Sequence, residues 1–319
     1  MQNNHQSLTS AGKIIILGEH SVVYGAPALA LPLAGAVNAN FKKRDDHQFK
    51  LFSSAGEIRD PLIVRALSRL RSLSDTAGFD LTITRNQLPT GSGLGSSAAL
   101  SFLLAKTALR LERITPPQLQ QIHDLTHELE KVFHSNPSGI DDTVVCHRKP
   151  VIFQKGGYAN STQLKGSSFT NEIFFPSLHL PDDLQFSICC SKTKTSTSKM
   201  VKLVKHTLES ENSQKEFKNN MEIIFNKAML NWKSDDFISF GQKLSLVHSY
   251  YIQLGISTPQ LDDIVEIALN QGALGAKLSG SGGGGCAIIL HKKRELLPIK
   301  NELQNIGYLF LKLEPSYSL

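Results

Sequence analysis

Apolar and polar residues follow one another along the chain in patterns that predict both strands and helices. Short apolar runs at residues 14–17, 28–36, 185–190 and 286–290 predict buried strands, the second of them broken by Pro32. Alternation over residues 79–84 predicts a half-buried strand. The segments that we predict to be helical are 96–111, 116–133, 197–211, 214–232, 236–251 and 258–271. Because helices and strands are mixed without strict alternation, the predicted fold class is α+β.

The length of the chain limits it to one or two domains. A chain of 319 residues can form one large domain or two of ordinary size. Residues 178–184 read LHLPDDL, a segment suited to a crossing between domains. We therefore predict an N-terminal domain over residues 1–182 and a C-terminal domain over residues 183–319.

Composition and charge argue against several classes of protein. No apolar run approaches the ~20 residues that cross a bilayer, and the polar N-terminus lacks a signal peptide, so we expect a cytoplasmic protein without membrane contact. The four cysteines show no metal or disulfide spacing and are expected to be buried or semi-buried thiols. The net charge of +6 suits an anionic ligand. A basic nucleic-acid-binding protein remains a distant alternative, because no Lys/Arg stripe interleaved with aromatic residues is present.

The first candidate for chemistry is the glycine-rich loop at residues 89–99, PTGSGLGSSAA. Glycines let the backbone turn tightly and approach a ligand, and the helix that follows offers unpaired N–H groups to a phosphate. The loop lacks the Lys-Ser/Thr pair of a Walker A motif and the clean spacing of a dinucleotide fingerprint. A glycine turn that only caps a core helix is the alternative interpretation.

The second candidate is the segment 130–142, EKVFHSNPSGIDD. Glu130 ends a predicted helix, and Asp141 follows a Pro/Ser/Gly turn, so the two carboxylates could converge on one point. Such a pair suits a metal-bound phosphate beside a proton acceptor. The alternative is that Asp141 only caps the next helix.

The third candidate is the loop 277–286, KLSGSGGGGC, which runs directly into an apolar strand. Many glycines are costly in chain entropy, so this stretch favours close approach to a ligand over a flexible linker. Near the N-terminus, Lys13 precedes the first predicted strand, and Glu19 and His20 follow it. Taken singly, each of these three side chains could be an ordinary surface residue.

Together, the segments SAGKIIILGEHSVVYG, LPTGSGLGSSAAL, HELEKVFHSNPSGIDD and KLSGSGGGGC resemble the GHMP kinases. This family is named for galactokinase, homoserine kinase, mevalonate kinase and phosphomevalonate kinase. The first and third segments resemble most closely the branch that phosphorylates mevalonate. The resemblance covers the chain from about residue 10 to about residue 290. It implies an ATP-dependent small-molecule kinase with a ribosomal-protein-like N-terminal domain and a ferredoxin-like C-terminal domain.

The resemblance also implies a role for individual residues. Asp141 matches the catalytic aspartate and Lys13 the lysine beside the transferred phosphate. Nucleotide contacts fall on Lys13, Asn86, Gly91, Ser92, Gly93, Leu94, Gly95, Ser96 and Ser97. Ser97 and Glu130 match the Mg²⁺ ligands, and Glu19, His20, Gly280 and Ser281 the substrate contacts. The family further implies a homodimer.

The chain departs from the family pattern at three places. Ser135 stands where Gly is usual, and Asp142 stands where Asn is usual. The arginine-bearing segment at the start of the C-terminal domain reads here TKTSTSK, so Lys194 or Lys199 must replace the arginine. Since lysine cannot form the bidentate fork of arginine, phosphomevalonate remains an alternative substrate. A sugar is disfavoured by the opening motif.

Overall fold

The structure, a computed structural model, describes residues 6–89, 91–112, 116–134, 137–154, 166–168, 173–193, 196–311 and 315–316. They fall into two compact units. The first comprises Met1–Lys13, Pro32–Pro89 and Gly95–Arg148, and the second Ile14–Leu31, Thr90–Leu94 and Lys149–Leu319. Because the units interleave along the chain, the domain boundary between residues 182 and 183 stays a prediction.

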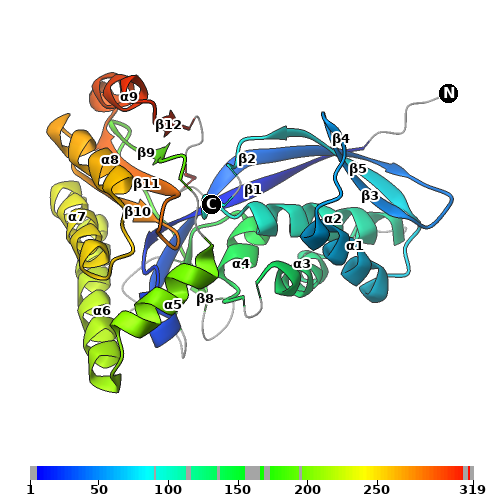
Figure 1. Ribbon diagram of the computed structural model, residues 1–319, viewed down its shortest axis with the longest axis horizontal. Helices are drawn as coiled ribbons and strands as arrows, with labels where there is room; N and C mark the ends of the chain where they lie inside the picture. Colours follow the sequence, from blue (N-terminus) through cyan, green and yellow to red (C-terminus); the bar gives the residue numbers. More distant parts are fainter. Residues whose placement is uncertain are drawn as a thin grey trace. The chain divides into compact units, whose positions relative to one another are not determined.

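Two long strands, β1 (Gln6–Leu17) and β2 (Ala28–Lys43), pair with each other and contribute residues to both units (Figure 1). In the first unit, β3 (Phe49–Ser53), β4 (Gly56–Glu57) and β5 (Phe79–Asn86) extend the sheet in the order β4-β3-β5-β2. Strand β5 runs antiparallel to β2 and parallel to β3.

Strand β2 is continuous, so the expectation that Pro32 interrupts it is wrong. Residues 28–30 of β2 pair with β6 (Val151–Phe153), whereas residues 37–43 pair with β5. Pro32 lies between these two pairings, where its missing N–H removes no hydrogen bond from either ladder.

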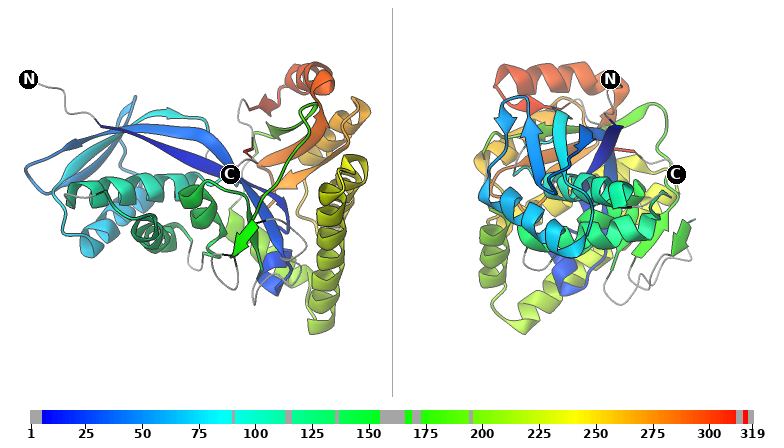
Figure 2. Two further views of the ribbon diagram at one scale, coloured as in Figure 1. Left: turned by 180° about the vertical axis from the view of Figure 1, so that it is seen from behind. Right: turned by 90° about the vertical axis from the view of Figure 1, so that its right-hand side faces the viewer.

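Four helices of the first unit lie along one face of this sheet (Figures 1 and 2). They are α1 (Pro61–Leu73), α2 (Ser96–Glu112), α3 (Leu119–Phe133) and α4 (Ile140–His147). Helix α1 begins where the Asp60 carboxylate accepts the backbone N–H groups of Leu62 and Ile63, with Pro61 at the first position. Helix α2 is buried along most of its length, which explains its alanine-rich and leucine-rich sequence.

The second unit contains an antiparallel sheet with the strand order β10-β11-β9-β12. Its strands are β9 (Leu184–Cys190), β10 (Gly275–Ser279), β11 (Cys286–Lys292) and β12 (Leu309–Phe310). The start of β2 joins β6, β8 (Ile173–Pro176) and β7 (Gly166–Ser168) in the order β2-β6-β8-β7. The mixture of these sheets with helices confirms the α+β class.

Helices fill the remainder of the second unit. They are η1 (Ser21–Tyr24), α5 (Thr197–Thr207), α6 (Glu211–Lys233), α7 (Phe237–Gln253), α8 (Pro259–Asn270), η3 (Lys293–Glu295) and α9 (Leu296–Asn305). Trp232 on α6 packs against Phe186 and Phe240 and donates its indole N–H to the His179 carbonyl at 2.7 Å. The aromatic cluster therefore ties α6 and α7 to strand β9.

The expectation of four thiols is wrong for two of the cysteines. Cys190 on β9 and Cys286 on β11 are direct cross-strand partners and form a disulfide. Their separation of 96 residues hid this pairing from any reading of the sequence. Cys146 and Cys189 are free, and burial raises the pKa of each thiol to about 12.

The helices within the described ranges do not have the character of membrane-spanning segments. None of them joins sufficient length to sufficient hydrophobicity to cross a bilayer.

Candidate active site

A lysine and an aspartate form an ion pair within the first unit. The Nζ of Lys13 on β1 lies 2.9 Å from the Oδ1 of Asp141, in the first turn of α4. The Lys13 side chain is 6% exposed and the Asp141 side chain 30%. The aspartate is therefore reachable from solvent, while the lysine stem is packed in the unit. Asp141 does not cap α4, because Gly139 is the N-cap residue and no side chain caps this helix.

The second carboxylate of the site lies on the neighbouring helix. Glu130 on α3 is buried, and its two oxygens accept hydrogen bonds from two serines one turn apart on α2. Ser97 Oγ donates to Oε2 at 3.1 Å, and Ser101 Oγ donates to Oε1 at 2.9 Å. Ser101 was not among the predicted site residues, although its spacing of four from Ser97 places both on one helical face.

The charge of Glu130 is poorly compensated. Burial, reinforced by the negative charge of Asp141, raises its pKa to about 8. A bound cation would offset both effects. The donors that are present, one hydroxyl and one carboxylate, are the hard oxygen ligands that Mg²⁺ prefers, so Ser97 and Glu130 fit the group that the sequence predicts.

The end of the glycine-rich turn packs tightly against Lys13. Gly95 has φ +78°, and a Cβ atom added there would lie 2.8 Å from the Lys13 Cγ and 3.2 Å from its backbone N. Only glycine combines this backbone conformation with this close approach. Helix α2 begins one residue later, at Ser96. The turn thus delivers the N-terminus of a helix beside the lysine, an arrangement suited to phosphate.

In the second unit, Glu19 belongs to a fully buried polar cluster. Its carboxylate is 2.5 Å from the Nζ of Lys277 on β10 and accepts the hydroxyl of Tyr251 on α7 at 3.0 Å. Exposure is 0% for the Lys277 side chain and 1% for that of Glu19. Burial lowers the pKa of Lys277, and burial together with the Glu19 charge raises that of Tyr251 well above its usual value.

The Glu19 carboxylate, predicted as a substrate contact, is thus bound to Lys277 and Tyr251 in the interior of the second unit. Lys277 and Tyr251 were not among the predicted site residues. A lysine within the buried strand β10 was the available signal for the first, because a buried lysine requires an acidic partner. Tyr251 gave no signal, since a tyrosine on a helix is usually an ordinary core residue.

His20 follows Glu19 in an unusual conformation. Its φ of 58° lies in the left-handed region, which β-carbon-bearing residues rarely adopt. The ring Nε2 donates to the Ser281 carbonyl oxygen at 2.9 Å, and burial lowers the pKa of the imidazole. A neutral ring that donates through Nε2 keeps Nδ1 as an acceptor for a hydroxyl group.

The two glycine-rich loops contact each other within the second unit. A Cβ atom added at Gly93 would lie 3.1 Å from the Gly280 Cα, and one added at Gly285 would lie 3.3 Å from the Ser92 carbonyl oxygen. Their backbones therefore pack without side chains between them. Gly91 is exposed, and Leu94 and Ser92 are buried.

The remaining predicted positions are less informative. Asn86 ends β5, is exposed, and accepts the backbone N–H of Leu88 at 2.9 Å. Lys199 is exposed in the first turn of α5. Ser135 and Lys194 lie outside the described residues. The structure brings Lys13 and Asp141 together and, separately, Ser97 and Glu130, whereas every assigned role stays a prediction.

Comparison with known proteins assigns the class. The GHMP kinases N-terminal domain matches residues 61–149, and the GHMP kinases C-terminal domain matches residues 215–309. The chain therefore belongs to the GHMP kinase family.

The chain is similar to individual members of the family in both sequence and fold. The chain is 28% identical over 319 residues to the mevalonate kinase of Thermococcus onnurineus, covering 90% of this chain and 89% of the relative. The crystal structure of the Methanococcus jannaschii mevalonate kinase superposes with a TM-score of 0.75 at 21% identity, covering 99% of this chain and 100% of that one. The Lactococcus lactis galactokinase structure gives a TM-score of 0.79 at 18% identity, covering 99% and 94%. The fold is thus shared across members with different substrates.

Proposed function

We propose that this chain transfers the γ-phosphoryl group of ATP to the primary alcohol of mevalonate. The observation that carries the proposal is the ion pair between Lys13 and Asp141. The same unit holds the Ser97–Glu130 pair and the helix N-terminus at Ser96, and the charge of Asp141 acts on Glu130. Support for mevalonate as the substrate comes from relatives named mevalonate kinase, which are 28% identical to this chain over 90% of its length.

The reaction follows from the charges of this pair. The Asp141 carboxylate accepts the hydroxyl proton of the substrate while the substrate oxygen bonds to the γ-phosphorus. The bond from that phosphorus to the bridging oxygen breaks, and ADP leaves. Lys13 stabilises negative charge on the attacking oxygen and on the transferred group, a contribution of about 3–4 kcal/mol for one well-placed donor. Proton acceptance by Asp141 contributes about 10²- to 10⁴-fold.

Ser97 and Glu130 would hold Mg²⁺, which supplies neutralisation of phosphate charge when bound. Their oxygens already converge, with the Ser97 hydroxyl 3.1 Å from the Glu130 carboxylate. Gly91, Ser92, Gly93, Leu94, Gly95 and Ser96 would hold the triphosphate, with Asn86 as a further nucleotide contact.

The substrate contacts would come from the second unit. His20 offers Nδ1 as an acceptor, and the loop with Gly280 and Ser281 would lie against the substrate. The buried contacts of Glu19 support a role in positioning His20 rather than direct contact with substrate. Lys199, exposed at the start of α5, would supply positive charge for the substrate carboxylate.

A substrate panel tests the proposal. ADP release would be measured with mevalonate, phosphomevalonate and galactose, with the product identified by ³¹P NMR. The proposal predicts that kcat/KM is highest for mevalonate, which yields a phosphate monoester on the primary alcohol. A higher kcat/KM for phosphomevalonate would transfer the function to that substrate. No turnover together with salt-dependent RNA binding would favour the nucleic-acid-binding alternative.

The family resemblance also leads us to propose a cytoplasmic homodimer. Sedimentation velocity of the purified chain would give a dimer mass, and a monomer at micromolar concentration would remove this part of the proposal.

A further inference from the structure

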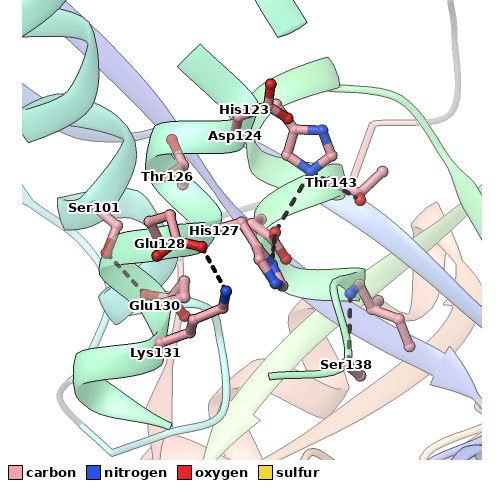
Figure 3. Close-up of polar contacts among 12 residues, drawn as sticks. Ser101, His123, Asp124, Thr126, His127, Glu128, Glu130, Lys131, Ser138 and Thr143 are labelled. Carbon is pink, nitrogen blue, oxygen red and sulfur yellow. Dashed lines mark hydrogen bonds and ion pairs between the residues drawn. The ribbon is translucent and has the colours of Figure 1, made fainter. Parts of the chain in front are cut away.

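Directly after Asp141, a second aspartate is buried and held by histidines from the neighbouring helix. Asp142 on α4 is 1% exposed at its side chain. His127 on α3 donates its Nδ1–H to Asp142 Oδ2 at 2.7 Å. The Nε2 of His123, one turn earlier on α3, lies 3.4 Å from the same oxygen and 3.2 Å from Thr143 Oγ1 (Figure 3). We call Asp142, His127 and His123 the α3–α4 clamp.

The clamp is electrostatically unusual. Burial would raise the pKa of Asp142, but the hydrogen bonds and charges of His123 and His127 outweigh it and hold the pKa below its ordinary value. Only one carboxylate oxygen is used: Oδ1 is buried and finds no hydrogen-bond partner among the described residues. A half-satisfied buried carboxylate costs free energy that an apolar side chain would not. Stability alone does not favour this residue here.

The position of the clamp suggests what it does. His127 precedes Glu130 by three residues on α3, so both side chains leave one face of that helix. Asp142 directly follows Asp141 in the first turn of α4. The hydrogen bond between His127 and Asp142 therefore links the helix turn that carries Glu130 to the helix turn that carries Asp141. His127 and Glu130 are both labelled on α3 in Figure 3.

Other uses of this cluster are less well supported. The described residues contain no group of three or more His, Cys, Asp or Glu arranged to hold a metal ion. The His123 ring also packs edge-on against the ring of His147 at the end of α4, with ring centroids 5.3 Å apart. Its orientation is therefore restricted by α4. The geometry thus suits a fixed link between helices.

We propose that Asp142, held by His127 and His123, is a positioning residue that sets the Asp141 carboxylate relative to Glu130 for phosphoryl transfer. The inference rests on the function proposed above. A displacement of about 1 Å at a reacting group can cost roughly a hundredfold in rate. Loosening the clamp should therefore lower kcat while leaving ATP binding intact, because the nucleotide loop is untouched.

Variants at His127 test the clamp, because its side chain is 35% exposed whereas that of Asp142 is 1% exposed. A change at His127 therefore disturbs the packed interior less than a change at Asp142 would. His127→Leu removes the donor, whereas His127→Asn keeps an N–H near the position of Nδ1. We expect His127→Leu to lower kcat roughly ten- to hundredfold with the KM for ATP within about twofold, and His127→Asn to restore most of kcat. His206→Leu is the control and should behave as wild type, because His206 on α5 is exposed and its partner, Glu209, is exposed as well.

Three outcomes would overturn the inference. The first is a wild-type kcat in His127→Leu. The second is an equal loss of kcat in His127→Leu and His127→Asn, which would mean that the hydrogen bond is irrelevant. If His127→Leu does not fold, His127→Ala takes its place. This variant also removes the donor to Asp142 and is expected to lower kcat roughly tenfold. An unchanged kcat in His127→Ala would be the third outcome.

A second readout separates this inference from the proposed function. Hydrogen exchange of residues 140–147, followed by mass spectrometry, needs no substrate. The clamp predicts faster exchange in His127→Leu than in His127→Asn, and equal exchange would contradict it. A wild-type enzyme that leaves mevalonate unchanged but shows this difference would refute the function and retain the clamp.

Discussion

Removing the ammonium group of Lys277 should destabilise the second unit strongly. The Lys277 Nζ lies 2.5 Å from the Glu19 carboxylate, and the two side chains are 0% and 1% exposed. Lys277→Met keeps the length of the side chain. Among the described residues it leaves the buried Glu19 carboxylate with the Tyr251 hydroxyl as its side-chain hydrogen-bond partner. Breaking a buried ion pair by removing one partner costs about 3–5 kcal/mol, and that is the expected loss in free energy of unfolding.

The partner variant should cost less. In Glu19→Gln, Lys277 keeps a hydrogen bond to the Leu278 carbonyl at 2.6 Å and lies over the Tyr251 ring. Its pKa is already lowered by burial, so the amine can lose its proton and relieve the unpaired charge. The double variant, Glu19→Gln with Lys277→Met, removes both charges and should regain most of the loss, to within about 1 kcal/mol of wild type.

Urea unfolding provides the assay, because the chain has a single tryptophan and Trp232 lies in the second unit. Lys218→Met is the matched control: Lys218 pairs with Glu222 at 2.9 Å, but the side chains are 33% and 30% exposed. A half-exposed pair of this kind is screened by solvent and should contribute less than about 1 kcal/mol. If Lys277→Met cost no more than Lys218→Met, the argument from burial would be wrong.

Three further changes probe the first unit. Ser97→Ala and Glu130→Gln should each raise the Mg²⁺ concentration for half-maximal rate by at least about tenfold, and unchanged Mg²⁺ dependence in both would place the metal elsewhere. Without Mg²⁺, the pKa of about 8 at Glu130 means that the folded state keeps a proton that the unfolded state loses above its ordinary pKa of 4.5. The free energy of unfolding, measured by urea titration at each pH, should therefore fall between pH 5 and 8. It should fall less in Glu130→Gln. The same pH dependence in wild type and Glu130→Gln would contradict the assignment of a raised pKa to Glu130. Gly95→Ala would press on Lys13 and should lower kcat at least about tenfold, whereas Gly35→Ala, which meets nothing within 4 Å, should leave kcat unchanged; equal effects would show that the close approach is irrelevant.

Local patterns predicted much of the fold. The helix predicted over residues 96–111 is α2, Ser96–Glu112, because a glycine turn marks its start and a run of alanine and leucine defines its body. The predicted 258–271 helix is α8, Pro259–Asn270, with Thr258 as its cap. In both cases the signal lies within a few residues of the element that it specifies.

Long-range pairing could not be predicted in the same way. Because proline has no backbone N–H, Pro32 predicted a break in the strand. Whether the missing N–H costs a hydrogen bond depends on where strands β5 and β6 pair, and both lie more than forty residues away in the sequence. The disulfide between Cys190 and Cys286 depends on the register of β9 against β11. Register follows from the packed sheet and is not written in either segment alone.

The candidate site shows the same division. Lys13 and Asp141 were predicted together through resemblance to a family, since 128 positions separate them and no spacing rule connects them. The histidines of the α3–α4 clamp carried no such resemblance. Their role emerges only when helix α3 is seen against α4.

The most direct measurement of the central claim is a single-turnover experiment with Asp141→Asn. Enzyme in excess would be mixed with γ-labelled ATP, Mg²⁺ and mevalonate, and label transfer to mevalonate would be followed beside nucleotide binding. The account predicts transfer slower by at least about a hundredfold with ATP bound as in wild type. Transfer at the wild-type rate would contradict it, because Asp141 could then not be the proton acceptor beside Lys13.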